Sequence, residues 1–349
     1  MIKSLKAGGS QLKLARCYAM PTAQLRKVLS TKSGSFLLAL PKNWALKMNI
    51  KGGDQVVVEE LDDGSLIIKP QVEAENEGEK LTETVIEYSD TLERDVLGRY
   101  LMGYDIIRVA SPTKLTLEHR ERIKKAISSL IGVEVIEEKP NEVVLQCLLS
   151  PLAVPMKTLF KRADVIAQQM HGDSIKALID RDVELAQSVI RRDEDLNRIY
   201  FLIVRQLRTI IRNPRLADRA GIKLYECLDY RLAAKSIESI GDEAVSIATS
   251  IIKLLPYESK LEIEPEIVDL SNLVDKMHSE AFKAFMKSDY NLAIEIIRLS
   301  NRVHSMADAL NVKTLKLPAK VAFHMNSIVT SLKIIGDISV DIADLVVRP

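Results

Sequence analysis

A short phrase of sequence occurs twice in this chain of 349 residues and limits the folds open to it. Residues 237–248 and 332–343 match at six of twelve positions, and both copies place Ile-Gly-Asp among apolar residues at helical spacing. A glycine inside a helix costs about 1 kcal/mol relative to alanine, so its return at the same place indicates a structural reason. The phrase predicts a duplicated helical unit.

A second stretch of similarity lies upstream of each copy. Residues 170–200 laid over 277–307 give nine identities, and the offset then falls from 107 to 95. The first copy therefore holds an insertion of twelve residues, which we place around Pro214 and Gly221. We predict three helices per copy, with N-cap residues at Asp182 and Asp289 and helix ends near Pro214, Pro256 and Pro265.

Composition bounds the class of protein. The chain is 47% apolar and 28% charged, which is typical of a soluble globular protein of two or three domains. No apolar run reaches the roughly 18 residues that span a bilayer. Three widely spaced cysteines without a CxxC pair indicate a reducing compartment. We predict a cytoplasmic location and no membrane insertion.

Basic residues are concentrated near the N-terminus. Residues 1–70 carry 11 Lys and Arg against 5 Asp and Glu, whereas the remainder of the chain has a net charge of −5. Residues 20–53 hold six basic residues and no acidic one. A local excess of this kind is expected at a phosphate backbone.

The first half of the chain predicts two small folded regions. Short strands are expected over residues 27–29, 36–40, 55–59 and 66–69, with a helical turn over 42–48. Residues 82–150 predict a small α/β module with helices around 92–102 and 116–130 and strands over 105–109, 133–137 and 143–148. Residues 1–19 are expected to form a disordered basic arm, and residues 71–81 an acidic linker.

The motifs in residues 25–70 resemble those of the AbrB/SpoVT-type swapped-hairpin DNA-binding domain. They are Arg26-Lys27-Val28, Ser33-Gly34-Ser35, Leu40-Pro41-Lys42 with Trp44, Lys51-Gly52-Gly53-Asp54 and Asp63-Gly64-Ser65. The resemblance implies that two chains interleave into one barrel over residues 20–70, that the protein is a homodimer, and that the basic face contacts DNA. The residues expected to bind DNA are Arg26, Lys27, Lys32, Lys42 and Lys47.

The chemistry of these side chains suits contacts with phosphates more than base reading. Lysine acts as a point charge, and only Arg26 has the planar donors that read a base edge. The alternative is a solvated basic face used for solubility or protein contact. Trp44 is expected to anchor the small barrel core.

The duplicated phrase resembles the Gly-Asp helices of PhoU, the phosphate-uptake regulator family, which has two three-helix repeats. The first copy, Glu238-Ser239-Ile240-Gly241-Asp242, keeps the family's pattern of acids, and the second, Lys333-Ile334-Ile335-Gly336-Asp337, does not. The whole chain resembles the archaeal fusion of an AbrB-type domain to PhoU. The resemblance implies a multidomain fold: a swapped-hairpin β-barrel, a small α/β module and all-α tandem three-helix bundles over residues 151–256 and 257–349.

Acidic residues at helical spacing are candidate metal ligands. Glu238 and Asp242 lie one turn apart, where two oxygens could share a cation. The resemblance implies divalent or ferric ions, and it adds Asp193, whose neighbour Asn197 replaces a family acid. In the second copy Lys333 would repel a metal or pair with Asp337, which leaves Asp337 and Asp341 as an alternative pair.

The null hypothesis for these acids is that they face water or cap contacts between helices. His171 and His278 recur in the two copies, each with an acid two residues on, a spacing that does not share a helix face. We interpret both as structural or surface histidines.

The chain lacks phosphate-loop, dinucleotide, zinc-protease and serine-hydrolase motifs, so we do not expect an enzyme. We expect a transcriptional regulator of phosphate uptake whose helical half senses phosphate status through a metal and anion, or through a transporter ATPase or sensor kinase. The main alternative is an adaptor that regulates a phosphate transporter by protein contact, with the AbrB-like domain only dimerising the chain. A metal-dependent phosphohydrolase is the weakest alternative.

Overall fold

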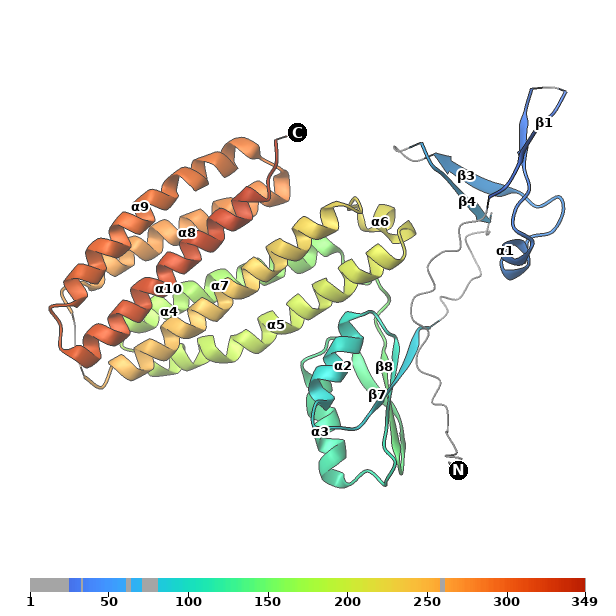
Figure 1. Ribbon diagram of the computed structural model, residues 1–349. Helices are drawn as coiled ribbons and strands as arrows, with labels where there is room; N and C mark the ends of the chain where they lie inside the picture. The colour runs from blue at the N-terminus through green and yellow to red at the C-terminus, as the bar shows by residue number, and fades with distance from the viewer. Residues whose placement is uncertain (1–24, 33, 61–63, 71–80, 258–260, 349) are drawn as a thin grey trace, which may run out of the picture. The chain divides into compact units, whose positions relative to one another are not determined.

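The computed structural model describes residues 25–32, 34–60, 64–70, 81–257 and 261–348. The chain divides into two compact units, residues 1–79 and 80–349, each described here by itself (Figure 1). The arm predicted over residues 1–19 and residues 71–80 of the predicted linker lie outside the described residues.

The N-terminal unit consists of two antiparallel hairpins and a short helix. Strands β1 (Val28–Ser30) and β2 (Phe36–Leu38) form the first hairpin, helix α1 (Lys42–Lys47) follows, and β3 (Val56–Glu60) pairs with β4 (Leu66–Pro70). Glycines with positive φ, such as Gly34 at 85° and Gly64 at 78°, form the hairpin turns, a conformation that other residues rarely adopt. Each predicted strand is confirmed to within two residues.

The hairpins have no core of their own in the part of the unit that the structure describes. Apolar side chains on all four strands are exposed, among them Leu29, Phe36, Val58 and Leu66. Half-buried Trp44 lies on α1, which has no buried residue. An exposed apolar surface of this kind is typical of an interaction site.

The second unit begins with an α/β module. Its elements are β5 (Glu83–Glu87), α2 (Leu92–Leu101), β6 (Ile106–Ala110), α3 (Leu117–Ser128), β7 (Val133–Lys139) and β8 (Glu142–Cys147). The sheet has the order β5-β6-β8-β7, with β5 parallel to β6 and the other neighbours antiparallel. Leu92, Tyr100, Val109 and Leu145 lie in its core, fully buried. The sequence did not predict β5.

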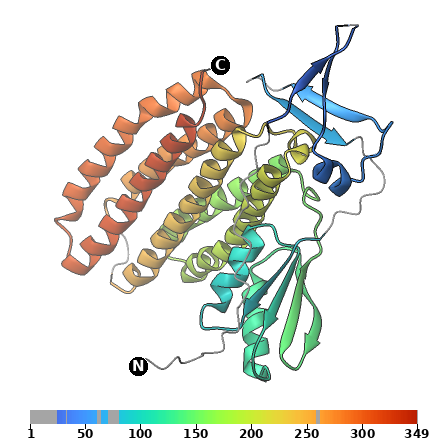
Figure 2. The ribbon, with the colours of Figure 1, turned by 45° about the vertical axis from the view of Figure 1, so that its right-hand side comes forward.

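The helical half follows the module. Its first repeat holds α4 (Met156–Asp180), α5 (Val183–Arg212), the short α6 (Arg215–Ala220) and α7 (Glu226–Leu254). Its second holds α8 (Glu264–Lys287), α9 (Tyr290–Thr314) and α10 (Ala319–Asp344). Helix α6 falls where the insertion was expected. The long helices run side by side in both views (Figures 1 and 2).

Two predicted helix starts are confirmed, and one predicted helix end is wrong. The side chains of Asp182 and Asp289 accept hydrogen bonds from the backbone N–H groups of Leu185 and Leu292, at 2.9 and 3.1 Å. Pro265, expected to end a helix, lies instead in the first turn of α8. Proline is tolerated there because the N–H it lacks would have no partner within the helix.

The two glycines of the repeated phrase allow helices to approach closely. A Cβ on Gly241 would lie 2.3 Å from Leu196 Cδ2, and one on Gly336 would lie 3.0 Å from Val303 Cγ1. Leu196 and Val303 are equivalent residues of the two repeats, 107 positions apart. The glycines therefore recur because the same helix crossing recurs.

The repeats share one hydrophobic core, in which α7 packs on α10 and α4 on α8. The α/β module is joined to this bundle by buried Arg205 of α5. Its guanidinium donates to the carbonyl oxygens of Tyr100 and Tyr104, at 2.9 and 2.7 Å, and to Asp105 Oδ1 at 2.9 Å. Across the described ranges, we find no helix with the length and apolar character needed to span a membrane.

Candidate functional site

The five predicted DNA-binding residues are exposed on the N-terminal unit. Arg26 and Lys27 directly precede β1, Lys32 lies in the turn between β1 and β2, and Lys42 and Lys47 are the first and last residues of α1. Within the described part of the chain, none of the four lysines forms an ion pair with a carboxylate. Their ammonium groups are therefore available to an anionic partner.

Helices α5 and α7 carry three predicted metal ligands of the first repeat, near enough for the charge of Asp242 to act on the other two. Glu238 is buried, Asp242 is half exposed one turn further along α7, and Asp193 faces them from α5. Burial and the neighbouring carboxylate of Asp242 raise the pKa of Asp193. Burial likewise raises the pKa of Glu238, although a hydrogen bond from Lys235 opposes the shift.

Lys235 lies beside the two predicted ligands of α7. The ammonium of Lys235 is hydrogen-bonded to Glu238 and lies 3.7 Å from Asp242 Oδ2. Burial lowers the pKa of Lys235, but the hydrogen bond and charge of Glu238 together with the charge of Asp242 oppose it, and the pKa is raised. In the described ranges, no three His, Cys, Asp or Glu side chains converge in a way that could hold a metal ion.

These acids therefore do not fit a resident metal ion while Lys235 is paired with them. Raised carboxyl pKa values favour proton binding, which competes with metal binding. The predicted metal site of the first repeat stays a prediction that depends on Lys235 moving away.

The second repeat has a different arrangement at the equivalent place. His304 Nε2 lies 2.6 Å from Asp337 Oδ1, and both side chains are partly exposed. The ion pair that we expected between Lys333 and Asp337 does not form, because His304 of α9 is the partner of this carboxylate. Asp341 lies one turn further along α10, and burial together with Asp344 and Asp337 raises its pKa.

His171 and His278 are interior residues, not surface residues. Both are fully buried where the repeats meet. His171 Nε2 lies 3.0 Å from the hydroxyl of Ser271, and His278 Nε2 lies 3.1 Å from Asp164 Oδ1. Positions 164 and 271 are equivalent in the two repeats, so each histidine faces the same position of the other repeat. Burial and nearby His278 lower the pKa of His171 to about 3.

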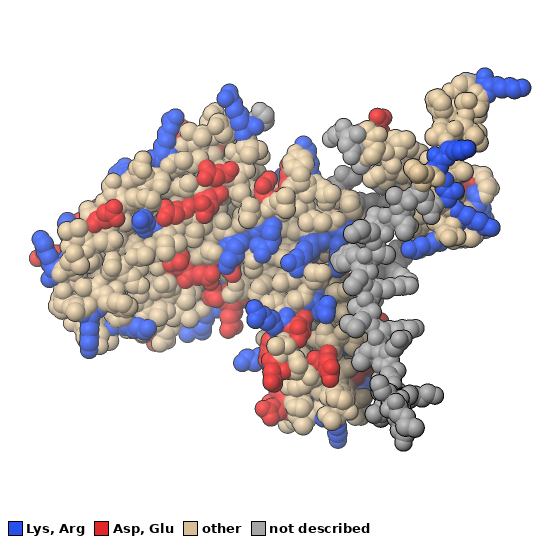
Figure 3. All heavy atoms as spheres, viewed as in Figure 1, with Lys and Arg blue, Asp and Glu red and all other residues tan. Residues whose placement is uncertain are grey.

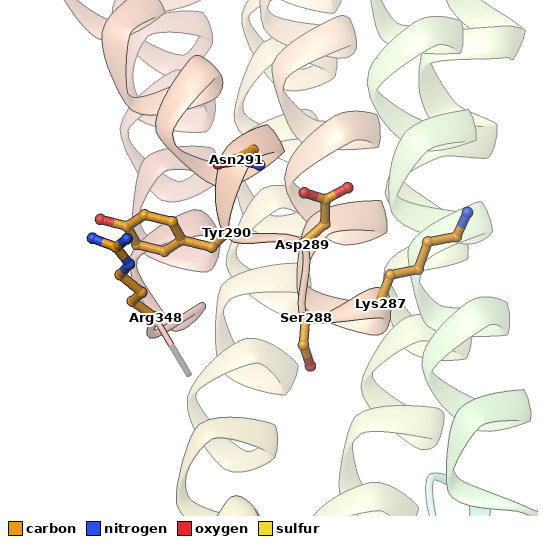
Figure 4. A pocket seen from close by; sticks show the side chains of 6 residues that line it. All are labelled: Lys287, Ser288, Asp289, Tyr290, Asn291 and Arg348. Atoms are coloured by element: carbon orange, nitrogen blue, oxygen red, sulfur yellow. The ribbon is translucent and has the colours of Figure 1, made fainter.

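A shallow hollow of about 560 Å³ lies at the turn between α8 and α9 (Figure 4). Lys287 and Arg348 supply two cations, but the carboxylate of Asp289 also lines it and already caps α9. The hollow contains none of the predicted site residues.

The sequence analysis did not identify Lys235 and His304 as partners of the predicted metal ligands, nor the basic region over residues 198–235. The (i, i+3) spacing of Lys235 and Glu238 could have indicated their pairing, whereas the pairing of His304 with Asp337 depends on packing between helices. The basic excess is also not confined to the N-terminus, because residues 198–235 carry nine Lys and Arg against three Asp and Glu. Lys and Arg side chains gather where α5 and α7 run side by side, beside a group of acids (Figure 3).

Comparison with known proteins supports the two resemblances independently. Residues 160–251 and 267–346 each match the PhoU domain. Residues 31–76 match the domain described as antidote-toxin recognition MazE, bacterial antitoxin.

Two named relatives align with the helical half. A phosphate-specific transport system accessory protein PhoU homolog of Pseudomonas aeruginosa is 27% identical over 190 residues, which cover 52% of this chain and 76% of the relative. The homolog of the same description in Caulobacter vibrioides is 26% identical over 186 residues, covering 52% and 75%.

A solved structure shows the same arrangement of helices. The crystal structure of PhoU from Pseudomonas aeruginosa superposes with a TM-score of 0.50 at 25% identity, covering 55% of this chain and 93% of that chain.

Proposed function

Because residues 160–251 and 267–346 of this chain each match the PhoU domain, we propose that the protein is a DNA-binding regulator of phosphate transport. The hairpin unit would bind DNA as a dimer. The helical half would receive phosphate status from a component of the transport system or from a sensor kinase. The regulatory role follows from the relatives, which are named as accessory proteins of phosphate-specific transport.

The main observation that supports DNA binding is the group of exposed basic residues on the hairpin unit. Lys27, Lys32, Lys42 and Lys47 are exposed and have no carboxylate partner among the described residues, which leaves them able to neutralise phosphates. The match to a MazE-type domain supports the same reading of this unit. Dimerisation would double the number of phosphate contacts and present two equivalent faces to a duplex.

A coupling mechanism follows from the way the second unit is built. Arg205 fixes the α/β module to the first repeat, so a partner that displaces α5 would move the module with it. In a dimer, such a movement would change the spacing of the two DNA-binding faces. The free energy of DNA binding would then change by at most the difference between the partner's binding free energies for the two arrangements.

The test is binding of the full-length protein to promoter DNA of phosphate-transport genes against a scrambled duplex, titrated with salt. We expect preferential binding, with a slope of log K against log salt of about −0.9 per phosphate contacted. The double variant Arg26→Ala, Lys42→Ala should bind weakly and with a shallower slope. The matched control is Lys316→Ala, which removes an exposed lysine from the helical half.

The second candidate function is an adaptor that regulates a phosphate transporter by protein contact, and the PhoU relatives favour it. In that case the hairpin unit would serve only to dimerise the chain. Equal and weak binding of both duplexes by the wild type and the double variant would support the adaptor and reject the regulator.

A further inference from the structure

Three leucines form a ladder on the outward side of the start of α7. Leu224, in the turn before the helix, and Leu228 and Leu232, within it, follow one another at intervals of four residues. They are 44%, 68% and 55% exposed. Single exposed leucines are ordinary, but Leu228 and Leu232 share one face of α7, and Leu224 continues their spacing into the turn before the helix.

Cations accompany this leucine ladder, because Lys223 and Arg231 directly precede Leu224 and Leu232 in the chain. Arg208 is exposed on the neighbouring helix α5, and Arg231 of α7 lies over the ring of Tyr200 at 5.1 Å. Lys223 lies over the ring of Tyr225 at 5.6 Å, at the start of the ladder. Within the described residues, none of the three cations has a carboxylate partner in an ion pair.

The second repeat lacks this combination at equivalent positions. Phe323, which corresponds to Leu228, is also exposed, at 71%. However, Leu232 and Arg231 correspond there to Ser327 and Asn326, and Arg208 corresponds to Leu315. The ladder with its cations therefore belongs to the first repeat alone, and α6, the insertion absent from the second repeat, lies directly before it in the chain.

We propose that the leucine ladder and its bordering cations bind an acidic amphipathic helix of a partner protein. The ladder extends over about 12 Å, which matches roughly two turns of a helix presenting apolar residues at the same interval. Arg208, Lys223 and Arg231, which have no carboxylate partner among the described residues, favour acidic flanks on that helix.

The leucine ladder distinguishes this partner from duplex DNA. A DNA backbone would satisfy the cations but would leave the leucines against phosphates and sugars, with no apolar surface to cover them. This inference rests on the part of the proposed function in which the helical half binds a partner protein. It does not depend on DNA binding by the hairpin unit.

The experiment measures fluorescence anisotropy of labelled peptides with the full-length protein in the absence of DNA. The probe is a helical peptide of about 16 residues with leucines at i and i+4 and glutamates on both flanks, long enough to form a helix on the surface. A second peptide carries lysines in place of the glutamates. The variants are Leu228→Ser with Leu232→Ser, and Arg208→Gln with Lys223→Gln, and the matched control is Phe323→Ser.

We expect the acidic peptide to bind the wild type and the basic peptide not to bind. The leucine variant should lose at least about tenfold in affinity, because apolar anchors carry much of the binding energy of such interfaces. The charge variant should bind more weakly and lose its salt dependence. Phe323→Ser and the double variant Arg26→Ala, Lys42→Ala should bind as the wild type does. All substituted positions are exposed, so the circular dichroism spectra should be unchanged.

Three results would overturn the proposal. Equal binding of the acidic and basic peptides would remove the role of charge, and undiminished binding by the leucine variant would remove the role of the ladder. Leucine-dependent binding to vesicles of anionic lipid, without peptide binding, would make this a membrane-contact surface. If DNA binding fails while the acidic peptide binds, the adaptor function stands and the docking surface with it.

Discussion

At the scale of single residues, the central glycine of the repeated phrase is set by what lies against it. A Cβ at Gly241 would meet Leu196 at 2.3 Å, which requires the leucine or the helix to move. Gly172, on α4, has nothing within 4 Å of the same position and is exposed. Gly172 is therefore a suitable control for Gly241, because both lie in helices of the first repeat and only Gly241 is closely packed.

We expect Gly241→Ala to destabilise the helical half by about 1–2 kcal/mol, because overpacking outweighs the gain in helix propensity. Gly172→Ala should instead stabilise it by up to about 1 kcal/mol. Urea unfolding followed by helical circular dichroism measures both. A stabilised Gly241→Ala variant would show that the close helix crossing is not required.

Buried His171 makes stability depend on pH. The pKa of His171 is lowered to about 3 in the folded protein, below the value of about 6.5 expected when unfolded. Between these values the unfolded chain binds a proton that the folded chain does not, so stability falls as the pH drops from about 6.5 towards 3. Above pH 6.5 this histidine has no effect on the pH dependence.

We expect His171→Gln to remove up to about 1.4 kcal/mol per pH unit from the slope of stability against pH in that window. The measurement is urea unfolding of the wild type and the variant between pH 4 and pH 8. Parallel curves for the two proteins would show that His171 is protonated in the folded state.

Lys235 supplies a positive charge beside the predicted metal ligands of the first repeat. Lys235→Met keeps the apolar stem and leaves Asp193, Glu238 and Asp242 without their compensating charge. We expect Mn²⁺ to bind the variant about tenfold more tightly than the wild type, since an exposed pair is partly screened by solvent. Isothermal titration calorimetry checks this, with Lys316→Met as control. Equally tight binding by the wild type would mean that Lys235 does not compete with the metal.

At the scale of elements, Arg205 is the connection between the α/β module and the bundle. Arg205→Met would keep the packing of the stem but remove the guanidinium that donates to Asp105 Oδ1 and to the carbonyl oxygens of Tyr100 and Tyr104. We expect the module to lose about 2–4 kcal/mol of local stability. Hydrogen exchange should then rise in α2 and β6 and stay unchanged in α8–α10. Arg208→Met, which changes an exposed arginine one turn along α5, is the control. An unchanged exchange rate in Arg205→Met would show that Arg205 does not stabilise the α/β module.

Most elements could be predicted because their patterns are local. Helix starts at Asp182 and Asp289 follow from capping chemistry, and the hairpin turns follow from glycines such as Gly34 and Gly64. Strand β5 could not be predicted, because a five-residue edge strand that begins and ends with glutamate shows little periodicity.

The candidate sites were predicted less well, because partners far apart in sequence decide them. The acids of the first repeat were identified from their spacing, but their chemistry depends on how Lys235 is placed. The pairing of His304 with Asp337 spans 33 residues and two helices. The burial of both interior histidines likewise arises from packing between the repeats, which a single helix pattern does not contain.

At the scale of the whole molecule, the two units differ in what they need to fold. Residues 80–349 have continuous buried cores, whereas the described hairpins expose the apolar side chains of all four strands. We expect the full chain to be a dimer held by the hairpin unit and residues 80–349 to be a folded monomer. Light scattering after gel filtration of both proteins tests this. A dimer of residues 80–349, or a monomeric full chain, would contradict it.

Each interior histidine contacts the other repeat, and this has an evolutionary consequence. In a dimer of identical subunits, one mutation changes both copies of a contact at once. Here the equivalent positions are Asp164 and Ser271 of a single gene product, so each could diverge while the other stayed fixed. Fusion of the two halves thus permits one histidine to face a carboxylate and its counterpart a hydroxyl, an asymmetry that a homodimer of single repeats could not inherit.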